Sequence, residues 1–198
     1  MIQSYQDYKE YLEADKVALS IQNPHDFVSW YGFHFWNEIY HFQRLLRKTE
    51  YYLNCSKTPV TKAYYCYLRD RLNRRQLKLG GLYIHPNCFG KELSIAHPGS
   101  IVVNVNARIG ENCRIHVGVS IGAQCRLGNN VYIGPGAKIF GDIIIADGIR
   151  IGANSVVNHS FLEPNVTIAG APARIVSQKG WAGSGSLKPK VLEDVKKT

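Results

Sequence analysis

A period of six residues runs through the middle of the chain and limits what it can fold into. From Val103 to Val157, every sixth residue is valine, isoleucine or leucine, ten times in succession. A small residue often follows, as at Gly110 and Gly122. This period fits neither an amphipathic helix nor an alternating strand, and it is typical of a hexapeptide β-helix. We therefore expect the aliphatic residues to point into a prism and to stack in coils roughly 4.8 Å apart.

The cysteines and the apolar pattern indicate where such a chain works. Its five cysteines are odd in number and contain no C-x-x-C motif. Cys113 and Cys125 fall in a compact register of the repeat, so we interpret them as small buried hydrophobic residues. No apolar run approaches the roughly 18 residues of a membrane-spanning helix, and the charged N-terminus does not look like a signal peptide. A reducing, cytoplasmic setting is expected.

The net charge is +9 and is spread evenly. Residues 1–82 carry 12 Lys and Arg against 8 Asp and Glu, and residues 83–198 carry 12 against 7. Even spreading argues against a basic tail for nucleic acid. An anionic substrate or an acidic membrane surface remains compatible with it.

Residues 1–80 lack the six-residue period and are predicted to form a small α-helical domain. Helices are expected over Ser4–Leu19, Phe35–Leu53 and 59–79, with Ser4 and Thr58 as start signals. Asn23-Pro24 should separate the first two helices, and Gly80-Gly81 should end the third. Aromatic residues are dense here and favour the core of this domain over a ligand site: Trp30, Tyr31, Phe33, Phe35, Trp36, Tyr40 and Phe42.

The third expected helix is basic. A solvated surface is the simplest interpretation, and contact with acidic lipid or a phosphorylated acceptor is the alternative. The cations are Arg69, Arg71, Arg74, Arg75 and Lys78.

The remaining chain divides into a β-helix domain at 81–178 and a flexible C-terminal tail at 179–198. Residues 157–168 are one residue short of two hexads, so the frame should slip there. A Gly-Ser linker at 183–186 supports a poorly ordered tail.

Three stretches resemble a known family. They are "GLYIHPNCFGKELSIAHPGSIVVNVNARIGENCRIHVGVSIG", "NNVYIGPGAKIFGDIIIADGIRIGANSVV" and "IAGAPARIV". Together they look like the serine acetyltransferase branch of the hexapeptide-repeat acyltransferases, over about residues 83–176. The short helical domain is more similar to the smaller forms associated with capsule and surface polysaccharides. The resemblance implies a mainly β fold, a left-handed parallel β-helix after a helical N-terminal domain.

The resemblance also implies a catalytic histidine. His97 matches the family's general base, and a neutral imidazole can take a proton from an attacking hydroxyl. His116 lies 19 residues further on, close to one coil, and is our candidate for a second polar group in the site. A corner histidine facing solvent is the equal alternative for His116, and His85 is a weaker candidate. A capped turn residue is the competing interpretation of His97.

Two departures from the family pattern concern the acceptor. The family's acidic residues before I-H-P and before the catalytic histidine are replaced by Tyr83 and Ala96. The family also interrupts its hexads after the position of Ile121, whereas this chain keeps its frame to Leu127. Both departures weaken the case for L-serine more than the case for acetyl transfer.

By the same resemblance, acetyl-CoA lies along a groove between neighbouring prisms of a homotrimer. Gly134, Gly152 and Gly170 are 18 residues apart and are expected in one column, with Ala153 and Ala171 beside it. Corner geometry alone also explains these glycines. Arg174 and Lys179 follow the last coil and are expected to meet the phosphates.

The sequence therefore predicts an acetyl-CoA-dependent O-acetyltransferase without a metal or a nucleic-acid partner. A sugar hydroxyl of a surface polysaccharide or its precursor is placed slightly ahead of L-serine as the acceptor. A zinc-dependent β-helix hydratase would need three convergent histidines, and no third appears at repeat spacing. A non-catalytic scaffold is the remaining alternative, because the acidic partners are absent.

Overall fold

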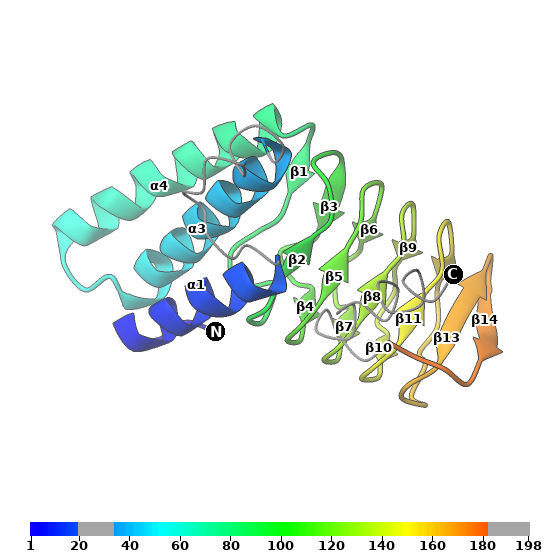
Figure 1. Cartoon of the computed structure of the whole chain (residues 1–198). Helices are drawn as coiled ribbons and strands as arrows, with labels where there is room; N and C mark the ends of the chain where they lie inside the picture. Colours follow the sequence, from blue (N-terminus) through cyan, green and yellow to red (C-terminus); the bar gives the residue numbers. More distant parts are fainter. Residues whose placement is uncertain (20–33, 182–198) are drawn as a thin grey trace, which may run out of the picture.

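The computed structural model describes residues 1–19 and 34–181, with the backbone alone at 34–37. It confirms the predicted fold, a left-handed parallel β-helix that follows a small helical domain (Figure 1). Several expectations fall outside the described residues: the break at Asn23-Pro24, the side chains of Trp30, Tyr31, Phe33, Phe35 and Trp36, and the linker at 183–186.

The helices match their sequence signals closely. Helix α1 spans Tyr5–Ala18 and helix α4 spans Pro59–Lys78. Each begins with a capping box, in which the hydroxyl of Ser4 or Thr58 accepts a hydrogen bond from the backbone N–H three residues later. Helix α3 spans His34–Cys55 and lies between the other two, packed against both. The three predicted helices are thus confirmed within two residues at each end.

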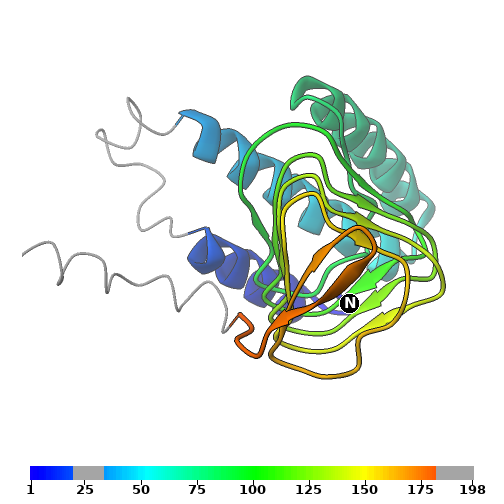
Figure 2. The same ribbon diagram turned by 90° about the vertical axis from the view of Figure 1, so that its right-hand side faces the viewer.

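Short parallel strands form the β-helix, and three sheets make its three faces (Figure 2). One sheet has the order β1-β3-β6-β9-β12, another β10-β7-β4, and the third β14-β13-β11-β8-β5-β2. The strands are β1 (Leu82–Tyr83), β2 (Ser94–Ile95), β3 (Ile101–Val103), β4 (Arg108–Ile109), β5 (Arg114–Ile115), β6 (Ser120–Ile121), β7 (Arg126–Leu127), β8 (Tyr132–Ile133), β9 (Lys138–Ile139), β10 (Ile144–Ile145), β11 (Arg150–Ile151), β12 (Val156–Val157), β13 (Thr167–Gly170) and β14 (Ala173–Ser177).

The aliphatic residue of each hexad points into the prism, as predicted. In the third sheet, Ile115 pairs with Ile133 and Ile133 with Ile151, and all three are fully buried. Burying each such side chain stabilises the fold by about 1.5–3 kcal/mol, so the stacked columns are its main source of stability. The frame slip is confirmed because Ile151 pairs with Ile168, 17 residues on, where the regular coil has 18. Cys113 and Cys125 are buried in this core.

The first coil of the prism has a neighbour on one side only. On that side the Gly90 N–H donates to the carbonyl of Ile109 in the next coil. On the other side there is no coil to continue the ladder, and unpaired buried backbone groups are costly. Polar side chains of the helical domain bond these groups instead. Gln43 donates to the Leu93 carbonyl at 2.7 Å, and Gln76 accepts from the Ile84 N–H at 2.7 Å.

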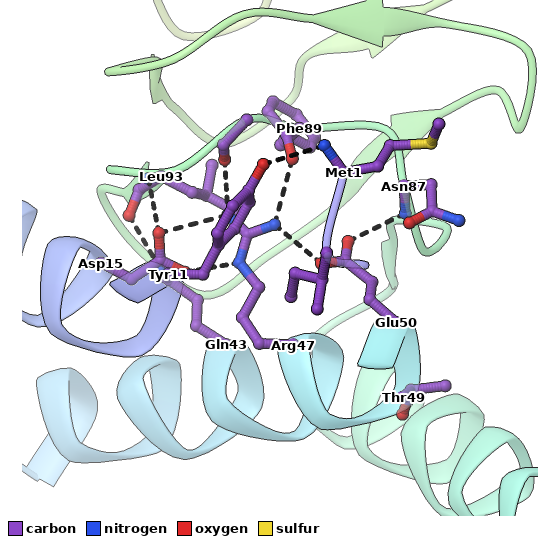
Figure 3. A network of polar contacts seen from close by, with 12 residues as sticks. Met1, Tyr11, Asp15, Gln43, Arg47, Thr49, Glu50, Asn87, Phe89 and Leu93 are labelled. Carbon is purple, nitrogen blue, oxygen red and sulfur yellow. Dashed lines mark hydrogen bonds and ion pairs between the residues drawn. The ribbon is translucent and has the colours of Figure 1, made fainter. Parts of the chain in front are cut away.

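Arg47 of α3 is at the centre of this capping layer (Figure 3). Its guanidinium, fully buried, donates to the carbonyls of Phe89 at 3.1 Å and Gly90 at 2.6 Å. It also makes a bidentate pair with Asp15 of α1 and donates to Glu50. Burial opposes its charge, but the two carboxylates outweigh that effect and raise the pKa of Arg47.

The two carboxylates extend the same network to the β-helix. Asp15 accepts from the Leu93 N–H at 2.9 Å, and Glu50 accepts from the Asn87 N–H at 2.8 Å. Two helices and the first coil are therefore joined through one buried cation. This network was not predicted from the sequence.

The last coil is closed by chain that follows the repeats. Strands β13 and β14 form an antiparallel hairpin across the end of the third sheet. The Trp181 N–H then donates to the Gly148 carbonyl at 2.8 Å, and the Trp181 side chain is only 3% exposed. A side chain at Gly180 would place its Cβ 2.1 Å from that same carbonyl, so glycine is needed there. Residues 179–181 of the expected flexible tail thus pack on the β-helix.

Replacing Arg47 with methionine should lower the free energy of unfolding by about 3–5 kcal/mol. The substitution leaves two buried carboxylates without their cation and two carbonyls without a donor. Urea unfolding followed by circular dichroism measures the change. The matched control is Arg44→Met, at an exposed position of the same helix, and we expect a change below about 1 kcal/mol there. An equal effect of the two substitutions would contradict the role given to Arg47.

Candidate functional site

Two of the predicted site residues meet at one corner of the prism. His97 follows β2 and His116 follows β5, and these strands pair in parallel so that Ile95 lies opposite Ile115. The pairing continues one residue further, because the Ala96 N–H donates to the Ile115 carbonyl at 2.9 Å. This coil spans 20 residues rather than 18, so His116 stacks beside Ala96 and diagonally to His97. The two imidazole rings lie 6.4 Å apart, centroid to centroid, within one chain.

His116 is held in a neutral form. Burial lowers its pKa to about 4, and the nearby charges of Arg114 and of His97 act in the same direction. Its Nε2 atom is buried and has no hydrogen-bond partner within the protein. A buried polar atom without a partner is costly. The arrangement therefore suits a group that hydrogen-bonds a ligand, and it does not suit a proton acceptor near pH 7.

Aromatic and basic side chains continue from His116 along the outer face of the third sheet. The Tyr132 ring lies 5.0 Å from the His116 ring and 5.9 Å from the Trp181 ring. The guanidinium of Arg150 lies over Tyr132, 5.5 Å from the ring centroid. This group was not predicted from the sequence. The sequence does contain a pattern that could have indicated it. Arg114, Tyr132 and Arg150 each precede an inward-pointing isoleucine and are 18 residues apart, which is one coil.

The other histidines of the repeat region lie elsewhere. His85 follows β1 on a different sheet, and its ring packs edge-on against Tyr83 at 5.0 Å. His159 lies beside Phe161, with a hydrogen bond between its Nδ1 and the Asn158 side chain. Neither His85 nor His159 lies at the corner that holds His97 and His116.

The two departures from the family pattern are visible in the structure. At the positions of the expected acids, Tyr83 is exposed and Ala96 is buried. The chain passes from β6 to β7 through a short corner at 122–125 without an insertion. Within the described residues, no acidic side chain is hydrogen-bonded or ion-paired to His116.

The expected column of glycines is correct in part. Gly134 and Gly152 stack so closely that a Cβ on Gly134 would lie 2.7 Å from the Ala153 nitrogen. The prediction that Gly170 continues this column is wrong. The frame slip brings Ile168 opposite Ile151, so Ala169 stands over Gly152 and Gly170 is one residue beyond it.

The other residues expected at the coenzyme end lie on or after the closing hairpin. Ala171 is in the exposed turn between β13 and β14. Arg174 is exposed on β14, opposite Ala169. Lys179 has an exposed side chain, and its carbonyl accepts a hydrogen bond from the Thr167 hydroxyl. Arg174 and Lys179 thus follow the last coil, as expected from the sequence, whereas Ala171, which was expected beside the glycine column, lies in the turn of the hairpin because of the frame slip.

The basic helix α4 is largely surface, in agreement with the simplest interpretation. Arg69, Arg71, Arg74 and Lys78 are exposed, while Arg75 is half-buried and pairs with Glu38 of α3. Arg74 pairs with Asp70. Contact of this surface with an acidic membrane stays a prediction. No helix in the described part of the chain is long and apolar enough to cross a membrane.

Comparisons with known proteins agree with this description. The family model "Bacterial transferase hexapeptide (six repeats)" matches residues 106–141. No curated protein matches the sequence. A serine acetyltransferase solved in complex with cysteine is 28% identical, with a TM-score of 0.68 over 89% of this chain and 68% of that one.

Two coenzyme complexes are similar to the same degree. A serine acetyltransferase in complex with CoA is 28% identical, with a TM-score of 0.66 over 88% of this chain and 71% of that one. The Brucella abortus serine acetyltransferase in complex with coenzyme A is 26% identical, with a TM-score of 0.69 over 90% and 71%. Such coverage includes the helical domain as well as the prism. Fold, repeat and similarity together support a serine acetyltransferase-like acyltransferase of the left-handed β-helix type.

Within residues 1–19 and 34–181, no three His, Cys, Asp or Glu side chains are grouped so that they could hold a metal ion. The zinc-hydratase alternative therefore has no candidate ligand set in this part of the chain.

The free energy of unfolding should fall as the pH falls from about 6.5 to about 4. Because folding lowers the pKa of His116, the unfolded chain binds its proton more readily, and acid favours unfolding in this range. In His116→Gln this part of the pH dependence should be absent. Urea unfolding at several pH values measures it, and parallel curves for the two proteins would contradict the buried, neutral state of His116.

Proposed function

We propose that this protein is an acetyl-CoA-dependent O-acetyltransferase that uses His97 as its general base. The observation that carries the proposal is the corner where His97 stands beside a neutral His116 whose Nε2 is buried without a partner. A corner with two histidines, of which His116 is kept neutral by burial, can divide the work of proton transfer and charge stabilisation. The similarity to serine acetyltransferases makes acetyl transfer the reaction that best fits it.

The chemistry follows from these two groups. The imidazole of His97 takes the proton of an acceptor hydroxyl as its oxygen attacks the thioester carbon of acetyl-CoA. The carbonyl oxygen becomes an oxyanion, and an Nε2–H of His116 can donate a hydrogen bond to it. When the carbon–sulfur bond breaks, the proton passes from His97 to the departing thiolate. The products are an acetyl ester and CoA with a free thiol.

Acetyl-CoA is expected beside the column of small residues that includes Gly134, Gly152 and Ala153. At the exposed position of this column, Ala153 carries only a methyl group, so a ligand can approach the backbone closely there. In the proposal, three copies of the chain assemble with this column facing a groove between neighbouring prisms. Gly170, Ala171, Arg174 and Lys179 lie at the end of the column, where the two cations can meet phosphate groups.

The acceptor is a sugar hydroxyl of a surface polysaccharide or its precursor in this proposal. The unbroken corner after β6 and the apolar or aromatic residues at Ala96 and Tyr83 leave the site without the groups expected for L-serine. L-serine is the second candidate, and the similarity of 25–28% to several serine acetyltransferases favours it. A cytoplasmic location is part of the proposal for either acceptor, since acetyl-CoA is the donor in both reactions.

Replacing His97 with alanine should lower kcat by about 10²–10⁴, because the hydroxyl then loses its general base. The KM for acetyl-CoA should change little. Release of the CoA thiol, followed with a thiol reagent, measures both constants with nucleotide sugars, oligosaccharides and L-serine as acceptors.

His159→Ala is the matched control for this experiment, since His159 lies in the same repeat region and outside the His97 corner. We expect its kcat within about twofold of the wild-type value. Unchanged thiol release by His97→Ala would refute the general base. Thiol release that depends on L-serine alone would refute the sugar acceptor.

Replacing Ala153 with tryptophan should raise the KM for acetyl-CoA by about tenfold or more, because the exposed indole fills the space next to the small-residue column. Ala123→Trp is the control, at an exposed corner without such a column. Thiol-release kinetics give the KM values, and sedimentation should show three copies for the wild type. A monomeric wild type, or equal KM values for the two variants, would contradict the groove between chains.

A further inference from the structure

The outer face of the third sheet carries a line of side chains that the proposed reaction does not use. Ser94, Arg114, Tyr132, Arg150 and Thr167 are register partners on successive strands from β2 to β13. Parallel neighbours are roughly 4.8 Å apart, so the Cα atoms of Arg114 and Arg150 are about 10 Å apart. His116 lies beside this line, and His97 beside His116. Arg114 is therefore on the strand next to the one that precedes His97, and Arg150 is two strands further along the same face.

In the part of the chain that the structure describes, no carboxylate is paired with these cations. The strands of this sheet contain no Asp or Glu. Among the described residues, neither Arg114 nor Arg150 forms an ion pair. Arg114 is half-buried, and burial lowers its pKa. A cation that is partly withdrawn from water without an opposite charge is unfavourable unless an anion binds there.

Neighbouring groups hold the two guanidinium groups in place. Arg114 donates to the hydroxyl of Ser94, itself buried, at 3.0 Å. Arg150 lies over the Tyr132 ring, which is packed in turn between His116 and the buried Trp181. Cations fixed in this way lose little freedom when they bind a carboxylate or a phosphate.

Outward-pointing arginines also occur on another sheet, in a different setting. Arg108 and Arg126 are register partners on β4 and β7, and both are exposed. Arg108 donates to two backbone carbonyls, of Val105 and Ala107, at 2.7 Å each. The face with β4 and β7 has no histidine pair beside it. It therefore offers matched positions for comparison.

We propose that Arg114 and Arg150 bind an anionic group of the acceptor, so that the enzyme selects an acceptor carrying a carboxylate or a phosphate. This inference rests on the proposed function and narrows its acceptor to an acidic class. The anion would lie on the outer face of the third sheet while the acceptor hydroxyl reaches His97. Arg114 and Arg150 are then specificity residues, outside the proton transfer itself.

The test compares acceptors that carry an anionic group, called the acidic probes, with counterparts that lack it, called the neutral probes: D-glucuronate and glucose 6-phosphate against glucose, and L-serine against L-serinamide. The full chain should show kcat/KM at least about tenfold higher for the acidic member of a pair. Arg114→Gln and Arg150→Gln should each remove most of this preference, with the KM for acetyl-CoA within about twofold of wild type. Arg126→Gln should keep the preference.

Thermal unfolding separates this proposal from the reaction itself. The acidic probes should raise the Tm of the wild type and of Arg126→Gln, and should not raise that of Arg114→Gln or Arg150→Gln. If no acceptor supports thiol release while these Tm shifts occur, the proposed reaction fails and the anion site stands. Equal use of acidic and neutral probes would overturn the proposal, as would the absence of Tm shifts. A larger rise in the KM for acetyl-CoA than for the acceptor would assign the cations to the phosphates of CoA, which also overturns it.

Discussion

The arrangement of the two domains depends on the hydrogen bonds and ion pairs of one buried side chain, Arg47. A β-helix has two open ends, and at each one a row of backbone donors and acceptors lacks the next coil. At the first coil, one cation from α3 bonds two of these carbonyls and fixes two carboxylates that bond two of the N–H groups. Side chains of the helices therefore make the hydrogen bonds that a further coil would otherwise make, and the helical domain occupies the place next to the first coil.

The stacked repeat then determines where the candidate site is. Residues far apart in sequence become neighbours whenever their strands pair, and small changes in coil length change which residues meet. The 20-residue coil between β2 and β5 brings His116 beside Ala96, so that both histidines share a corner. The 17-residue coil between β11 and β13 places Ala169, and not Gly170, over Gly152. Both the candidate site and the wrong expectations for Gly170 and Ala171 follow from the same register.

Much of the fold could be predicted from the sequence, because its signals are local. The hexad period identified the prism, and Ser4, Thr58 and Pro59 marked helix starts that the structure confirms. The capping network was missed because it depends on contacts across 30 to 80 residues. The spacing of Gln43, Arg47 and Glu50 along an otherwise apolar helix face was its sequence signal. The group around Tyr132 was missed for a similar reason, since Trp181 reaches it from beyond the last repeat.

The capped first coil has a consequence for assembly. If the first coil were uncapped, its unpaired backbone N–H and C=O groups could pair with the end coil of another β-helix. With Arg47, Asp15 and Glu50 occupying that edge, and the antiparallel β13–β14 hairpin closing the opposite one, the rod has a fixed length. End-to-end strand pairing of two prisms is then blocked at both edges. In the trimer proposed above, lateral association would put the corner that carries His97 and His116 at the boundary between chains.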